Sequence, residues 1–143
     1  MNVKDIMTTQ VAYVDANATV AEAAKLMQKH NIGSVPVCEG TRVVGIITDR
    51  DIVVRNVAHG KSADSTPVRE VMTSKVHTVS PETDIQQVAG IMAEQQVRRL
   101  PVVEGDRLVG MISLGDLATE ALYDVEVART LGEISEPSRP FRM

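Results

Sequence analysis

Two stretches of the sequence place a hydroxyl residue three positions before an aspartate, where an apolar run ends. Thr48 and Asp51 form the first pair, and Ser113 and Asp116 form the second. A carboxylate in such a place can accept hydrogen bonds from both vicinal hydroxyls of a ribose, and a helix N-terminus has free N–H groups that suit a phosphate. The same spacing is typical of a capping box, in which both side chains satisfy the first N–H groups of a helix. Spacing alone leaves a sugar-phosphate site and a helix cap as alternatives.

A glycine precedes each pair by three residues, Gly45 in the first copy and Gly110 in the second. Because glycine has no side chain, we expect a ligand to approach the backbone closely at these positions. The recurrence of the whole arrangement favours a binding role more than one copy would.

Two adjacent arginines, Arg98 and Arg99, form the second candidate feature. The equivalent positions in the first copy are Gly33 and Ser34. A guanidinium group can bind two phosphate oxygens at once, so this asymmetry predicts one cleft with phosphate-binding charge and one without. Two solvated arginines between a helix and a strand are the alternative.

The sequence offers binding features without reactive ones. His30, His59 and His77 have no metal-ligand spacing with one another or with Cys38. There is no glycine-rich phosphate loop and no recognised pair of nucleophile and base. We therefore predict a binding protein rather than an enzyme, with no catalytic residue, no metal and no covalent cofactor.

Bulk properties exclude several classes of partner. The formal net charge is −4 at pH 7, and the aromatic residues are limited to Tyr13, Tyr123 and Phe141. Such a chain lacks the positive charge and the stacking platforms that nucleic acids require. No apolar run approaches the length of a membrane span, and no signal peptide is evident. With a single cysteine, which rules out an intrachain disulfide, these features predict a soluble cytoplasmic protein.

The candidate residues are positioned by a scaffold that the sequence contains twice. Residues 36–48 read PVCEGTRVVGIIT and residues 101–113 read PVVEGDRLVGMIS, at a constant offset of 65 residues. Two copies are too few for an open solenoid, so we predict two half-modules packed about a pseudo-twofold axis, with ligand clefts between them. The predicted boundaries are 1–57 for repeat 1, 58–67 for a linker, 68–131 for repeat 2 and 132–143 for a C-terminal tail.

Each repeat shows the same order of local patterns. The first expected elements are a strand, at 11–14 or 76–79, and an amphipathic helix that ends at Asn31 or Gln96. Two hairpin strands follow, at 34–39 and 42–48 in repeat 1 and at 99–104 and 107–113 in repeat 2. A second helix begins at 49 or 114, and the one in repeat 2 is expected to reach about Leu131. Thr19 with Glu22, and Asp84 with Gln87, have capping-box spacing. Pro36 and Pro101 predict an edge strand or a bulge, and the tail from Ile134 is expected to fray. The unit is β-α-β-β-α, present twice, which is an α+β architecture.

Several of these motifs together resemble a known family. VKDIMT at 3–8, SVPV at 34–37 and VGIITDRD at 44–51 are similar to the cystathionine β-synthase (CBS) domain, and two copies in tandem resemble a Bateman module. The resemblance covers about residues 3–56 and 68–122, and the chain also resembles small bacterial stand-alone CBS-pair proteins. It implies a regulatory module whose clefts bind an adenine nucleotide (AMP, ADP or ATP) or S-adenosylmethionine, a homodimer, and an unidentified regulated protein.

The resemblance also implies roles for individual residues. Ribose hydroxyls would be held by Asp51 and Asp116, ribose or phosphate by Thr48 and Ser113, and phosphate by Arg98 and Arg99. Backbone and apolar contacts to the adenine would come from Val14, Val35, Pro36, Thr78, Val79, Leu100 and Pro101, with Ala12 and His77 beside them. The alternative is a structural or interaction module with empty clefts, in which both hydroxyl–aspartate pairs are only helix caps.

Overall fold

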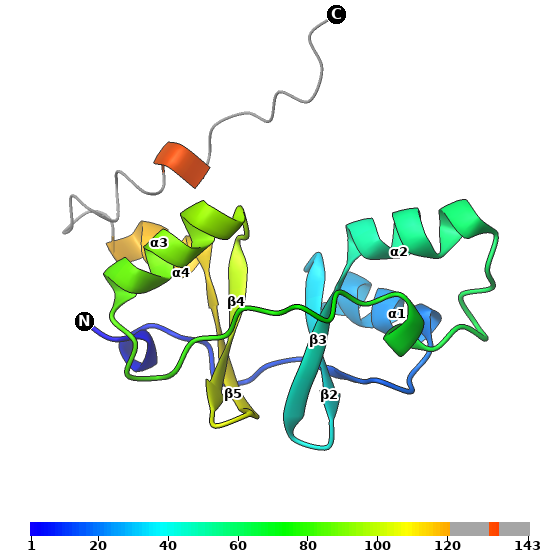
Figure 1. Ribbon diagram of the computed structural model, residues 1–143, viewed down its shortest axis with the longest axis horizontal. Helices are drawn as coiled ribbons and strands as arrows, with labels where there is room; N and C mark the ends of the chain where they lie inside the picture. Colours follow the sequence, from blue (N-terminus) through cyan, green and yellow to red (C-terminus); the bar gives the residue numbers. More distant parts are fainter. Residues whose placement is uncertain (121–131, 135–143) are drawn as a thin grey trace, which may run out of the picture.

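The protein is described by a computed structural model at residues 1–120 and 132–134. Its repeat 1 half contains β1 (Val14–Asp15), α1 (Val20–His30), β2 (Ser34–Glu39), β3 (Arg42–Thr48) and α2 (Asp49–Arg55). Its repeat 2 half contains α3 (Ile85–Gln95), β4 (Arg99–Glu104), β5 (Arg107–Ser113) and α4 (Leu114–Glu120). Short 3₁₀ helices lie at η1 (Val3–Asp5), η2 (Val57–His59) and η3 (Val68–Glu70). Figure 1 shows the two hairpins next to each other in the middle of the molecule, with each pair of helices on the outer side of its own hairpin.

The hairpin strands and the first helix of each repeat are confirmed with the predicted bounds. Thr19 and Glu22 form the capping box of α1, with hydrogen bonds of 3.2 and 2.8 Å. Asn31 and Gln96 end the helices in the left-handed conformation, with φ of 53° and 55°. The cap of α3 differs from the prediction, because Asp84 accepts from the Gln86 N–H (2.8 Å) rather than pairing with Gln87.

The first predicted strand of each repeat is largely wrong. The segment 11–14 contributes only Val14 to the two-residue strand β1, which pairs in parallel with β2. The segment 76–79 forms a single parallel bridge between Val79 and Val102. The physical reason is that both segments connect one half of the molecule to the other, so most of their length has no neighbouring strand with which to pair.

The five strands form one sheet in the order β1-β2-β3-β5-β4. The two hairpins meet at one residue pair, Arg42 opposite Arg107. Pro101 lies on the edge strand β4, and the register shifts directly after each strand proline, at Val37/Cys38 and at Val102/Val103. The prediction of an edge strand or a bulge is therefore confirmed.

Each repeat begins with a segment that packs on the other repeat. Val3 is fully buried in the core of repeat 2, and Val68 is fully buried in the core of repeat 1. Thr8 then pairs with Met111 on β5, and Thr73 pairs with Ile46 on β3. We call 2–12 and 67–77 the crossing segments. Their exchange interlocks the two halves, because neither core is complete without residues of the other repeat.

The crossing segments explain the two glycines that the sequence analysis assigned to ligand approach. A Cβ at Gly45 would lie 2.6 Å from Met72 Sδ and 2.9 Å from the Thr73 carbonyl oxygen. A Cβ at Gly110 would lie 2.8 Å from both Met7 Sδ and the Thr8 carbonyl oxygen. The close approach at both positions is therefore made by the protein's own chain, which corrects the expectation of a ligand there.

The linker and the tail are more structured than expected where they are described. Thr66 is buried, and its carbonyl oxygen accepts from the Val20 N–H at 2.9 Å, which fixes the linker against the start of α1. Ile134, predicted to fray, is 6% exposed and packs in the repeat 2 core. The predicted continuation of α4 to Leu131 lies outside the described residues.

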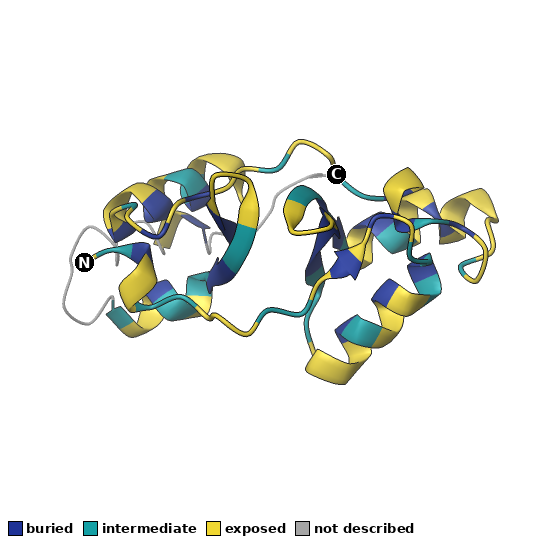
Figure 2. Cartoon of the chain, turned by 90° about the horizontal axis from the view of Figure 1, so that it is seen from below, coloured by how far each residue is buried: buried dark blue, intermediate teal, exposed yellow. Residues whose placement is uncertain are grey.

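Buried residues concentrate in the strands and on the inner faces of the helices, while the outer helix surfaces are exposed (Figure 2). Two apolar clusters result, one in each half. No helix in the described part of the chain is long and apolar enough to cross a membrane.

Candidate functional site

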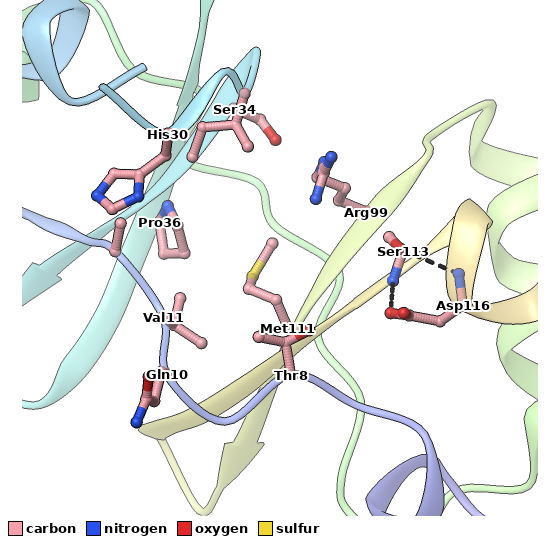
Figure 3. A pocket seen from close by; sticks show the side chains of 12 residues that line it. Thr8, Gln10, Val11, His30, Ser34, Pro36, Arg99, Met111, Ser113 and Asp116 are labelled. Atoms are coloured by element: carbon pink, nitrogen blue, oxygen red, sulfur yellow. Dashed lines mark hydrogen bonds between the residues drawn. The ribbon is translucent and has the colours of Figure 1, made fainter. Parts of the chain in front are cut away.

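A cavity of about 190 Å³ lies between the two halves, where the N-terminal crossing segment passes the starts of β2 and β4. Figure 3 shows side chains from both repeats pointing into it. We call it the Asp116 cavity. It is lined by Thr8, Gln10, Val11, Ala12, His30, Ile32, Ser34, Pro36, Arg99, Met111, Ser113 and Asp116.

Ser113 and Asp116 form one wall of the cavity. The Ser113 N–H donates to Asp116 Oδ2 at 2.8 Å, and the Asp116 N–H donates to Ser113 Oγ at 3.1 Å (Figure 3). This is the capping box that the spacing predicted at the start of α4. It uses one carboxylate oxygen, however, and Oδ1 of the half-buried Asp116 accepts no hydrogen bond from any described residue. The same carboxylate can therefore cap the helix and accept from a ligand.

Arg99 supplies the positive charge of the cavity. It is the first residue of β4, and Figure 3 shows its side chain near Ser34, the first residue of β2. The exposed guanidinium forms no hydrogen bond or ion pair with any described residue. Arg98 is also exposed but does not line the cavity. Because Arg99 lines the cavity and Arg98 does not, the two arginines are not equivalent.

The remaining wall is apolar and comes mainly from repeat 1. Val11 and Pro36 lie on the repeat 1 side of the cavity and Met111 on the repeat 2 side (Figure 3), and Ile32 also lines it. Thr8, Gln10 and His30 add polar side chains to the lining. The cavity thus combines a free carboxylate oxygen, an unpaired guanidinium and an apolar surface, which are the groups that a nucleoside with an anionic tail requires.

Sequence reasoning missed several of these residues, notably Gln10, His30 and Met111. They carry no motif of their own. Thr8 and Gln10 reach the cavity because the first segment of the chain packs on repeat 2, and local periodicity does not reveal that exchange.

The equivalent place in repeat 1 is closed. Asp51 is 8% exposed, and its Oδ2 accepts from the Thr48 N–H at 3.1 Å, while the Asp51 N–H donates to Thr48 Oγ1 at 3.0 Å. The Thr73 hydroxyl donates to the same carboxylate and lies 3.3 Å from each of its oxygens. Thr48 and Asp51 therefore act as a cap that the protein itself covers.

The other predicted adenine-contact residues lie elsewhere. Val14, Val35, Val79 and Leu100 are buried in the two cores, and Pro101 is buried within β4. Thr78 lines a second cavity, of about 220 Å³, beside the hairpin turn of repeat 2. Of the predicted set, Ala12, Pro36, Arg99, Ser113 and Asp116 come together in the Asp116 cavity.

Cys38 is the single cysteine of the chain and is buried. Burial raises the pKa of the Cys38 thiol, and the nearby Asp15 carboxylate raises it further. This disfavours the thiolate, and the equivalent residue of repeat 2 is the apolar Val103. Across residues 1–120 and 132–134, no three His, Cys, Asp or Glu side chains are grouped so that they could hold a metal ion.

The family is decided by a match along both repeats. The family model described as "CBS domain" matches residues 3–56 and 68–123. The chain belongs to the CBS-domain family. It is a tandem CBS pair, as the resemblance of its motifs predicted, and CBS pairs are regulatory modules.

Relatives match along most of the chain. The CBS domain-containing protein YhcV of Bacillus subtilis is 43% identical over 134 residues, which cover 94% of this chain and 95% of that protein. The crystal structure of Hypoxic Response Protein I with two coordinated zinc ions has a TM-score of 0.76 and 35% identity, and covers 84% of this chain and 98% of that one. The CBS domain pair of protein MJ0100, in complex with 5′-methylthioadenosine and S-adenosylmethionine, has a TM-score of 0.74 and 31% identity, over 83% of this chain and 94% of that one.

Proposed function

We propose that this CBS pair is a regulatory module that binds an adenosyl ligand in the Asp116 cavity. The observation that carries the proposal is the free Oδ1 of Asp116 in a cavity that also holds the unpaired Arg99 guanidinium. A half-buried carboxylate oxygen without a donor favours a ligand that brings hydroxyl groups. The adenosyl ligands of the MJ0100 pair support this class of ligand.

The cavity suggests one orientation for such a ligand. The ribose hydroxyls would donate to Asp116, with the Ser113 and Thr8 hydroxyls nearby. The base would lie against Val11, Pro36 and Met111, and an anionic tail would be directed at Arg99 and Ser34. AMP, ADP and ATP would each direct a phosphate at Arg99, and S-adenosylmethionine would direct the carboxylate of its methionine part there.

Binding can regulate because the cavity is built from both repeats. Its walls include the N-terminal crossing segment, which also completes the repeat 2 core through Val3. A ligand that fits one relative placement of the halves better than another shifts the balance between them by that difference in affinity. The target is an unidentified protein, and a cytoplasmic location without nucleic-acid or membrane partners stays a prediction.

A homodimer is part of the proposal. Val53, Val54 and Val57 form an exposed apolar strip on α2 and η2, which is unusual for side chains of this kind at a free surface. A second copy of the chain is the partner we expect on this strip. Sedimentation of the wild-type protein and of Val57→Asp would test it, with a dimer expected for the first and a monomer for the second.

The ligand proposal is tested by calorimetric titration with AMP, ADP, ATP and S-adenosylmethionine. The protein must first be shown by mass spectrometry to carry no co-purified small molecule. We expect heat and a raised melting temperature with at least one ligand, and at least a tenfold weaker affinity for Asp116→Asn, since charge-assisted hydrogen bonds contribute about 1.5–3 kcal/mol. The absence of heat and of any thermal shift with all four would refute the proposal.

The second candidate is an interaction module whose clefts bind nothing. The closed Asp51 site favours it, because there the hydroxyl–aspartate pair acts only as a cap. Under this alternative, Asp51→Ala and Asp116→Ala each cost about 0.5–2 kcal/mol of stability as lost caps, and no ligand effect is lost with either.

A further inference from the structure

The two repeats place a threonine of a crossing segment beside each aspartate, and the two threonines behave differently. Their backbones are equivalent. Thr73 exchanges hydrogen bonds of 2.8 and 2.9 Å with Ile46 on β3, and Thr8 exchanges two bonds of 2.9 Å with Met111 on β5. The difference therefore lies in the side chains and in what surrounds them.

In repeat 1 the threonine occupies the aspartate. The half-buried Thr73 hydroxyl is 3.3 Å from both Oδ1 and Oδ2 of Asp51. It lies where a sugar hydroxyl would have to lie in order to use that carboxylate. In repeat 2 the exposed Thr8 makes no hydrogen bond to Asp116, although both residues line the same cavity.

A second, independent contrast lies at the ends of the strands. Gly33 and Arg98 are equivalent positions, and their carbonyl oxygens accept from Asp49 and Leu114 N–H at 2.9 and 2.7 Å. The Asp49 carboxylate lies directly over Gly33, since a Cβ added there would be 2.9 Å from Oδ2. Repeat 1 thus has the Asp49 carboxylate beside Gly33, whereas the equivalent position of repeat 2 is Arg98, followed by Arg99. A carboxylate repels an anionic ligand tail.

We propose that the chain has one adenosyl site rather than two. Thr73 keeps the second site closed, because its hydroxyl donates to Asp51 in the place of a ligand hydroxyl. This inference rests on the proposed function of the Asp116 cavity. Thr73 is a residue that determines how many ligands the chain binds, because a ligand at Asp51 would have to displace its hydroxyl.

The test counts the ligands bound per chain. AMP and S-adenosylmethionine are titrated separately into ligand-free wild-type protein, Thr73→Ala and the matched control Thr8→Ala. Alanine removes the hydroxyl together with the methyl group and so frees the space beside each aspartate, while the backbone hydrogen bonds of the crossing segment remain. Circular dichroism and melting curves check that they fold as the wild type does.

The expected stoichiometry is one ligand per chain for the wild type, two for Thr73→Ala and no more than one for Thr8→Ala. Thr73→Ala combined with Asp51→Asn should return to one. Two ligands in the wild type, or one in Thr73→Ala, would overturn the inference while leaving the proposed function intact. Absence of binding to every protein would instead refute the proposed function, and the inference with it.

Discussion

The two halves of the molecule share their backbone and differ in their polar side chains. Both have the glycine that admits the crossing segment, the left-handed residue that ends the first helix, and the register shift after the strand proline. They differ at Asp51 and Asp116, one covered and one open to a cavity. Duplication has kept the features that hold the chain together, and the polar groups near the cleft have diverged. Function is therefore to be sought where the repeats disagree.

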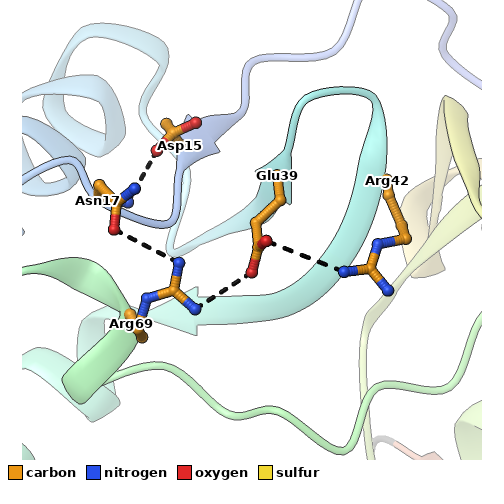
Figure 4. A network of polar contacts seen from close by, with 5 residues as sticks. All are labelled: Asp15, Asn17, Glu39, Arg42 and Arg69. Carbon is orange, nitrogen blue, oxygen red and sulfur yellow. Dashed lines mark hydrogen bonds and ion pairs between the residues drawn. The ribbon is translucent and has the colours of Figure 1, made fainter.

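The crossing segments show the same contrast (Figure 4). Arg69 in η3 pairs with Glu39 at 3.1 Å and donates to Asn17 at 3.4 Å, and Arg42 lies 3.9 Å from the same glutamate. Lys4 is the equivalent of Arg69 in the N-terminal crossing segment, and it forms no ion pair with any described residue. The segment that closes the Asp51 site is held by charge as well as by packing. The segment that lines the Asp116 cavity is held by packing and backbone hydrogen bonds, which leaves it freer to respond to a ligand.

The largest effect is expected where the two halves are alike. Gly110→Ala and Gly45→Ala should each lower the free energy of unfolding by about 3 kcal/mol, because the new Cβ meets a backbone carbonyl that cannot rotate away. Urea denaturation measures both. Gly90→Ala is the control, since it lies within α3 with nothing near its added Cβ, and it should stabilise by about 0.8 kcal/mol. If the first two variants were as stable as the wild type, the close packing of the crossing segments would be wrong.

The next effect tests the exchange of the crossing segments. Val3→Ala and Val68→Ala each remove two buried methyl groups and should cost about 2 kcal/mol apiece. Val3→Ala should also weaken ligand binding, because Val3 anchors the segment that lines the Asp116 cavity, whereas Val68→Ala should not. Equal effects of Val3→Ala and Val68→Ala on the affinity for the ligand would contradict a single site at the Asp116 cavity.

A smaller effect is expected from the charges of Figure 4. Arg69→Ala should cost less than about 1 kcal/mol, because the Arg69–Glu39 pair is partly exposed, and the loss should shrink at high salt. Lys4→Ala is the matched control and should leave the urea midpoint unchanged at any salt concentration. A larger loss for Lys4→Ala than for Arg69→Ala would reverse the contrast between the segments.

The smallest effect concerns Cys38, which repeat 2 replaces with Val103. Burial raises the pKa of the Cys38 thiol in the folded state, so above the free-thiol pKa of about 8.5 the unfolded chain loses a proton that the folded chain keeps. Stability should therefore be full below that pH and decline as the pH rises toward the folded pKa. Cys38→Val should remove this part of the alkaline decline, as unfolding curves at about pH 7 and about pH 9.5 would reveal. An unchanged slope would show that the thiol does not contribute.

The sequence predicts the hairpins and the first helices well because their information is local. Apolar periodicity, the Thr19 cap and the polar turns lie within a few residues of the elements they define. The prediction of strands at 11–14 and 76–79 fails. These segments contain strand-forming residues, but they run between the two halves, and no local pattern shows that a partner strand is missing there. The sequence also could not separate Asp51 from Asp116. Each carboxylate follows a hydroxyl residue by three positions, and each has an equivalent threonine, Thr73 or Thr8, in a crossing segment. Only the folded chain shows that Thr73 covers its aspartate while Thr8 does not.

Amide hydrogen exchange, measured by mass spectrometry with and without saturating ligand, tests the central claim most directly. The ligand is whichever of AMP and S-adenosylmethionine gives more heat in the titration. We predict slower exchange at 8–12 and 113–117, which border the Asp116 cavity, and unchanged exchange at 48–52 and 73–77. Equal protection of both sets, or protection confined to the second, would contradict a single ligand site at Asp116.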